Sequence, residues 1–156
     1  MDGQLLEMNK NPGFELGHMI IDKESKEKCN CGNYGCFETF ASMKRFKKRA
    51  ISVLKLPENY TSEELQMFIR NNIEKSNVNK FVNEYLDNVS IGLANIINIF
   101  EPEAICFGGS FSYYSDIFLP LLNKKIENYI FNKNSKIKFL QARLKNDAGI
   151  IGATEI

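Results

Sequence analysis

The chain has 156 residues, of which 44% are hydrophobic and 25% charged, values typical of one globular domain. Twenty Lys and Arg residues against 19 Asp and Glu leave no basic excess that would favour a nucleic acid or an anionic membrane. No apolar run approaches the roughly 20 residues of a membrane span, and the N-terminal residues MDGQLLEMNKNPG lack the pattern of a secretory signal. We therefore expect a single cytoplasmic domain over residues 1–156.

The first half of the chain predicts two strands followed by helices. Short apolar runs at residues 3–8 (GQLLEM) and 18–22 (HMIID) predict the strands. Apolar residues spaced through 37–54 predict a helix, and Thr61 followed by Glu63 and Glu64 is typical of another helix start.

The second half predicts alternating helices and strands. Apolar residues recur at helical spacing over 78–100, and Pro102 ends that pattern. Residues 104–107 then predict a buried strand, 115–131 a helix, 137–142 a strand and 147–156 the start of a helix. This alternation favours an α/β layer with a largely parallel sheet.

Three of the four cysteines, Cys29, Cys31 and Cys36, lie within eight residues. In the cytoplasm such a cluster is more often a metal or redox site than a set of disulfides, and no Cys-x-x-Cys pair supports a redox role. A tetrahedral zinc ion needs a fourth ligand, and the chain has one histidine, His18. The pattern predicts a closed, structural Zn²⁺ site of Cys₃His type, the alternative being free thiols that lie close by chance. Cys106 falls in an apolar strand and is expected to be buried and inert.

Two motifs carry a resemblance to a known family. GFELGH (13–18) followed by CNCGNYGCFE (29–38) resembles the paired signature of the ROK family of bacterial repressors and sugar kinases, which includes glucokinases. Weaker similarity continues through IINIFEPEAICFGGS (96–110) and NDAGIIGATEI (146–156). The resemblance implies an actin-like (ribonuclease-H-like) α/β fold, of which this chain would be the C-terminal lobe with its first strand missing.

The resemblance also implies roles for individual residues. Glu15, His18 and Glu38 would bind sugar hydroxyls, with His18 also on zinc, and charge-assisted hydrogen bonds to carboxylates suit that task. Gly108 and Gly109 would lie against the adenosine of ATP, although a turn that requires a positive φ explains such a pair equally well. A surface position is the ordinary alternative for either glutamate alone.

The chain also departs from the family pattern. Phe14 stands where the family usually has a small residue, and the Asp-x-Gly-x-Thr and Gly-Thr-Gly phosphate loops and the catalytic Asp of the kinases are not found in residues 1–156. By this comparison the chain alone should be inactive, and the intact protein, with its N-terminal lobe, would transfer phosphate from MgATP to a hexose. The alternatives are the sugar-sensing lobe of a ROK repressor, whose DNA-binding domain would lie outside this chain, and a stand-alone zinc-stabilised module. The family commonly dimerises through this lobe, so a homodimer is expected.

Overall fold

The computed structural model of the chain describes residues 13–144, 147 and 151. Its elements in chain order are the 3-10 helix η1 (Leu16–His18), α1 (Phe37–Ala41), α2 (Met43–Leu54), α3 (Ser62–Asn72), α4 (Ser76–Phe100), β1 (Ala104–Phe107), the 3-10 helix η2 (Gly109–Tyr114), α5 (Ser115–Ile126) and β2 (Lys138–Gln141). The strand expected at 3–8 lies outside the described residues, as does most of the helix expected from 147.

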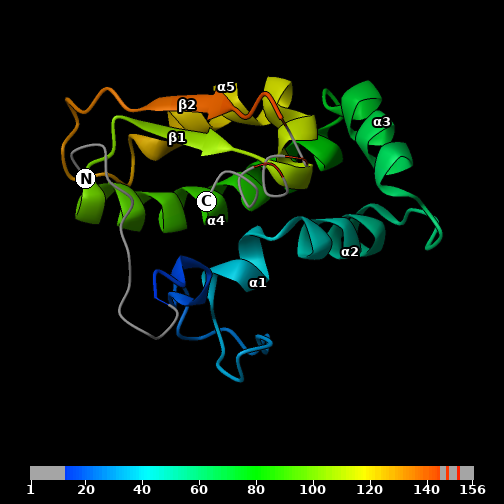
Figure 1. Ribbon diagram of the computed structural model, residues 1–156. Helices are drawn as coiled ribbons and strands as arrows, with labels where there is room; N and C mark the ends of the chain where they lie inside the picture. Colours follow the sequence, from blue (N-terminus) through cyan, green and yellow to red (C-terminus); the bar gives the residue numbers. More distant parts are fainter. Residues whose placement is uncertain (1–12, 145–146, 148–150, 152–156) are drawn as a thin grey trace.

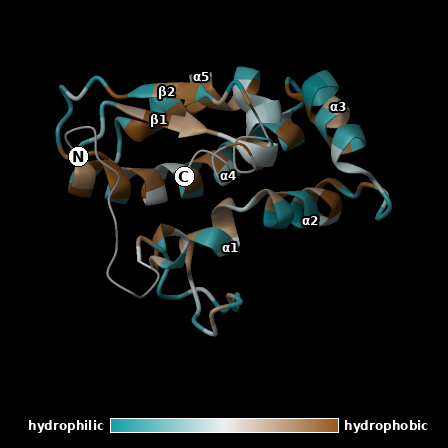
Figure 2. Cartoon of the chain, viewed as in Figure 1, coloured by the Kyte–Doolittle hydropathy of each residue, from teal (hydrophilic) through white to brown (hydrophobic). Residues whose placement is uncertain are grey.

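Helix α4 is the central element of the fold and confirms the periodic pattern seen in the sequence. Its buried residues recur at helical spacing, and it ends with Glu101 in a left-handed conformation, directly before Pro102. The core packs around the aromatic ring of Phe46, from α2, which contacts Phe81 and Tyr85 of α4 and Phe118 of α5. Figure 2 shows hydrophobic residues concentrated along α4 and β1, and hydrophilic ones along much of α3 and the loops.

The two strands pair in parallel, as the alternation of elements predicts. Ala104 lies opposite Lys138 and Cys106 opposite Leu140, with α5 in the crossover between the strands. The prediction of a buried strand and a buried Cys106 was wrong, because Cys106 is exposed. Ile105 and Phe107 face the core, but in the described part of the chain the sheet has two strands and no element covers its outer face.

Two helices and one strand differ from the sequence prediction. The helix expected over 37–54 is two helices, because Ser42 adopts an extended conformation (φ −67°, ψ 141°) between them. The strand expected over 18–22 is reduced to a single bridge between Ile20 and Cys36. The helix expected over 115–131 ends at Ile126. The start of α3 was predicted correctly: Thr61 and Glu64 form a reciprocal capping box.

The arrangement of the elements gives the molecule two sides (Figure 1). The strands lie on one side of α4, while η1, α1 and the loop between them lie on the opposite side, and α2 and α3 extend from one end. Within the described residues, no helix is long and apolar enough to cross a membrane.

Candidate metal centre and adjoining cleft

The four predicted metal ligands come together from three short segments. His18 is the last residue of η1, Cys29 and Cys31 belong to the loop that follows, and Cys36 is the residue directly before α1. The ligand atoms of all four lie within 4.8 Å of one another. Cys29 and Cys36 are buried, whereas Cys31 is exposed at the tip of the loop.

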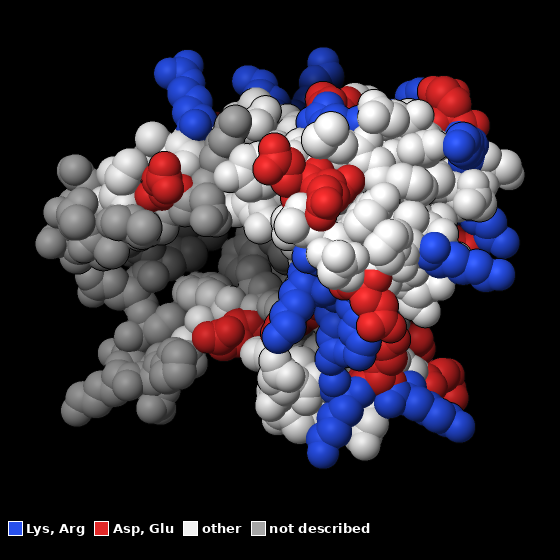
Figure 3. Space-filling model, turned by 90° about the vertical axis from the view of Figure 1, so that its right-hand side faces the viewer, with Lys and Arg blue, Asp and Glu red and all other residues white. Residues whose placement is uncertain are grey.

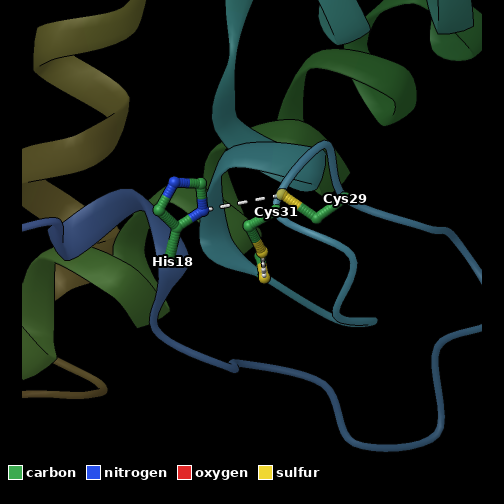
Figure 4. A group of neighbouring side chains, drawn as sticks. His18, Cys29 and Cys31 are labelled. Carbon is green, nitrogen blue, oxygen red and sulfur yellow. Dashed lines mark hydrogen bonds between the residues drawn. The ribbon is translucent and has the colours of Figure 1, made fainter.

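Two of the distances among these atoms match those expected around a tetrahedral zinc ion. His18 Nδ1 lies 3.6 Å from Cys29 Sγ, and Cys31 Sγ lies 3.6 Å from Cys36 Sγ (Figure 4). Ligands at about 2.0–2.3 Å from a tetrahedral ion stand roughly 3.3–3.8 Å apart. Soft thiolates with one imidazole favour zinc over magnesium or calcium, so both the donor set and its spacing fit zinc.

Backbone hydrogen bonds hold the loop in this form. The amide of Cys29 donates to the carbonyl of Asn33 at 2.8 Å, and that of Ile21 donates to the carbonyl of Gly35 at 2.9 Å. Gly35 has a φ of +74°, and a Cβ at this position would lie 1.9 Å from the carbonyl oxygen of Asp22. Glycine is therefore required there by its conformation and by the close approach of Asp22.

Without a metal, the pKa values of two of the cysteine thiols are shifted in opposite directions. Burial raises the pKa of the Cys36 thiol to about 12, whereas a backbone hydrogen bond at Asn33 lowers the pKa of Cys31 below its ordinary value. A metal binds thiolates, so its binding would displace the proton that Cys36 otherwise keeps.

A carboxylate lies beside the histidine at the edge of the cluster. Glu38, in the first turn of α1, has its Oε2 3.9 Å from His18 Nδ1, and both side chains are partly exposed. Glu15 lies one turn before His18, whose amide donates to the Glu15 carbonyl at 2.9 Å. The Glu15 side chain is exposed and, among the described residues, makes no hydrogen bond or ion pair. The structure therefore brings together His18 and Glu38, with Glu15 nearby on the same turn.

Helix α4 supports the segment that carries Glu38. The hydroxyl of Tyr85 donates to the carbonyl of Ala41, at the end of α1, at 2.8 Å. The ring of Phe37 packs directly on Gly92 of α4, where a Cβ would approach ring carbons to 2.3–2.4 Å. The buried face of α4 thus sets the position of Glu38.

A cleft of about 660 Å³ adjoins the second predicted site. Gly108 directly follows β1, and Gly109 is the first residue of η2. Gly109 has a φ of +56°, so the positive-φ turn expected of a glycine pair is present. The cleft lies beyond this turn, between α2, α3 and η2, and its lining includes Lys44, Lys47, Gln66, Ser110 and Tyr113. Its volume is in the range of small-molecule sites.

The α2 and α3 residues of this cleft were not among the site residues predicted from the sequence. Lys44 and Lys47 are three residues apart on α2, a spacing that places both on one helix face. The spacing of these two lysines was the sequence feature that could have indicated a binding surface, but it is equally typical of a solvated helix surface. Figure 3 shows Lys and Arg side chains gathered in the lower half of the face at the α3 end of the molecule, with Asp and Glu beside them.

The chain thus combines an α/β layer with a Cys₃His cluster and with a carboxylate, that of Glu38, beside the histidine of the cluster. A model of the ROK family matches residues 9–156. The chain belongs to the ROK family.

The relatives include both glucokinases and transcriptional repressors. The chain is 30% identical over 167 residues to a glucokinase of Thermotoga maritima, in an alignment that covers 99% of this chain and 52% of that protein. It is 29% identical over 152 residues to a putative xylose repressor of a Caldicellulosiruptor strain, covering 88% of this chain and 37% of the repressor. The chain thus spans about half or less of the length of these relatives.

Solved structures show the same fold. A ROK hexokinase from Thermus thermophilus superposes with a TM-score of 0.72 at 25% identity, over 90% of this chain and 46% of that one. A ROK-family glucokinase from Streptomyces griseus, in complex with glucose and AMPPNP, gives a TM-score of 0.74 at 23% identity, over 90% of this chain and 50% of that one. The chain therefore shares the actin-like fold of ROK sugar kinases.

Proposed function

We propose that this chain is the zinc- and sugar-binding C-terminal lobe of an ATP-dependent hexose kinase, which in the intact protein transfers a phosphoryl group from MgATP to a sugar hydroxyl. The observation that carries the proposal is the Cys₃His cluster with Glu38 beside its histidine. Zinc would be held by His18, Cys29, Cys31 and Cys36, and would supply structural rigidity. With four protein ligands, such a site has no open position for catalysis.

The sugar site would use the second ring nitrogen of His18 together with the carboxylates of Glu38, at the edge of the cluster, and Glu15. His18 offers Nδ1 to the cluster, which leaves Nε2 for a hydroxyl, and metal binding fixes its tautomer. The carboxylates of Glu38 and Glu15 would accept hydroxyl hydrogens in charge-assisted bonds. Both lie within one helical turn of a metal ligand, so ordering the loop also orders the sugar site.

The nucleotide would occupy the cleft beyond Gly109. Its lining combines tyrosine rings with the cations of Lys44 and Lys47, a mixture that suits a base and phosphates. Gly108 and Gly109 would let the backbone approach the adenosine. The attacking hydroxyl would be deprotonated by an Asp of the other lobe, and the sugar-binding groups of this chain would contribute positioning.

Titration calorimetry with a panel of hexoses, on the zinc-loaded chain, tests the sugar site. Glu38→Gln should weaken hexose binding about tenfold or more and retain one zinc, because it removes a charged acceptor from hydroxyl donors. His18→Ala should lose both zinc and sugar. Glu58→Gln, an exposed position away from the cluster, is the matched control and should change neither. Hexose binding of wild-type strength in Glu38→Gln, or full zinc content in His18→Ala, would contradict the proposal.

A repressor is the second candidate, because xylose repressors stand among the relatives beside the kinases. The same zinc and sugar residues would then sense an inducer, and a separate domain would bind DNA. ADP binding separates the two functions: a kinase lobe should bind ADP in the cleft, whereas hexose binding without ADP binding favours the repressor.

A further inference from the structure

A group of polar contacts joins α3 to η2 beside the proposed nucleotide cleft. Two side chains of α3 reach the same carbonyl: Gln66 Nε2 donates to the Tyr113 oxygen at 2.6 Å, and Arg70 Nη2 donates to it at 2.7 Å. The guanidinium of Arg70 also makes a bidentate pair with Asp116, with Nη2 to Oδ1 at 2.8 Å. More than 40 residues separate the partners in sequence, so these contacts fix one segment against the other.

The charges of this group suit the helices that carry them. Arg70 lies in the last turn of α3 and Asp116 in the first turn of α5, where a cation and an anion respectively complement the helix dipole. The planar guanidinium can serve a carboxylate and a carbonyl at the same time, which a lysine ammonium cannot do with the same geometry.

The contacts bear directly on the width of the cleft. Gln66 of α3 and Tyr113 of η2 both line it, on walls that come from different parts of the chain. Burial raises the pKa of the lining residue Tyr114 to about 12, and the positive charge of Arg70 acts in the opposite direction.

We infer that Arg70 is a positioning residue for the nucleotide: by binding Asp116 and the Tyr113 carbonyl, it holds η2 at a fixed spacing from α3 and keeps the cleft in its binding form. The inference rests on the proposed nucleotide site. Arg70 acts through the two segments that it joins, and no contact between Arg70 and the nucleotide is required.

The test compares ADP affinity, hexose affinity and melting temperature on the full, zinc-loaded chain. Arg70→Ala should weaken ADP binding about tenfold, since it removes charge-assisted hydrogen bonds between the walls, and should leave hexose affinity within about twofold. Arg70→Lys keeps the positive charge but not the planar guanidinium with its parallel donors, and should recover part of the ADP affinity.

The matched control is Asp87→Asn, which weakens another interhelical ion pair, Lys125 to Asp87 at 2.7 Å between α4 and α5, away from the cleft lining. It should lower the melting temperature by less than Arg70→Ala, because it weakens one contact and not three, and should leave ADP affinity unchanged. If wild type binds ADP and Arg70→Ala binds it equally well, or if Asp87→Asn weakens ADP as much, the positioning role is wrong. If wild type itself does not bind ADP, the nucleotide site is wrong and the role of Arg70 falls with it.

Discussion

Replacing Gly35 with alanine should weaken zinc binding much more than the same change at Gly32. Both glycines have a positive φ, +74° and +96°, and a left-handed conformation costs an L-residue about 1–2 kcal/mol. At Gly32 no atom lies within 4 Å of the added Cβ, so the conformational cost is the whole effect. At Gly35 the Cβ would lie 1.9 Å from the oxygen and 2.9 Å from the carbon of the Asp22 carbonyl, both backbone atoms.

Relief of that overlap requires the backbone at Asp22 to move away from the backbone at Gly35. The Gly35 carbonyl accepts hydrogen bonds from the amides of Ile21 and Asp22, at 2.9 and 3.4 Å, and separation weakens both. Each bond contributes about 0.5–1.5 kcal/mol, so the total cost at Gly35 is about 2–5 kcal/mol. Because 1.4 kcal/mol corresponds to tenfold in affinity, zinc should bind about 30-fold or more weakly in Gly35→Ala, and about 5- to 30-fold in Gly32→Ala.

Competition with a chromophoric zinc chelator measures both affinities in parallel. Far-ultraviolet circular dichroism of each variant should show unchanged helix content, because the substitutions lie outside the core of α2, α4 and α5. Equal losses of zinc affinity in the two variants would mean that the close approach of Asp22 to Gly35 has no effect on the metal site.

Three further predictions concern the hydrophobic core and the contacts of α4 that support the site. Phe46→Ala should lower the free energy of unfolding by about 3–5 kcal/mol in urea, because its ring is fully buried among aromatic partners, and a loss below about 1.5 kcal/mol would contradict that packing. Tyr85→Phe should cost about 1–2 kcal/mol in the same assay by leaving the Ala41 carbonyl without its donor, and an unchanged stability would mean that water replaces the hydroxyl. Gly92→Ala would ordinarily stabilise a helix by about 1 kcal/mol; here the overlap with Phe37 should reverse the sign and weaken hexose binding, and a raised melting temperature would show that the Phe37 ring moves freely.

Much of this fold could be predicted because its signals are local. The helical periodicity of 78–100, the Thr61–Glu64 cap and the apolar strands on either side of a helix each follow from residues near in sequence. The Cys₃His grouping was also predictable, since one histidine and three clustered cysteines leave a single combination of that type.

The missed features depend on tertiary contacts that no local pattern encodes. The break at Ser42 lies beside the Ala41 carbonyl, which Tyr85 binds from a helix more than 40 residues away. Cys106 was expected to be buried because apolar strands usually are, but exposure depends on what covers the outer face of the sheet. The link from Arg70 to Asp116 joins two helices whose sequences give no sign of pairing.

If the metal cluster holds the sugar-binding groups in place, hexose binding must depend on zinc. A calorimetric titration of one sample with glucose and the other hexoses, before and after zinc is removed by a chelator and then restored, measures that dependence. We expect one zinc per chain, hexose binding that is lost with the metal, and recovery of that binding when zinc returns. Hexose binding that persists at full strength in the zinc-free chain would contradict it.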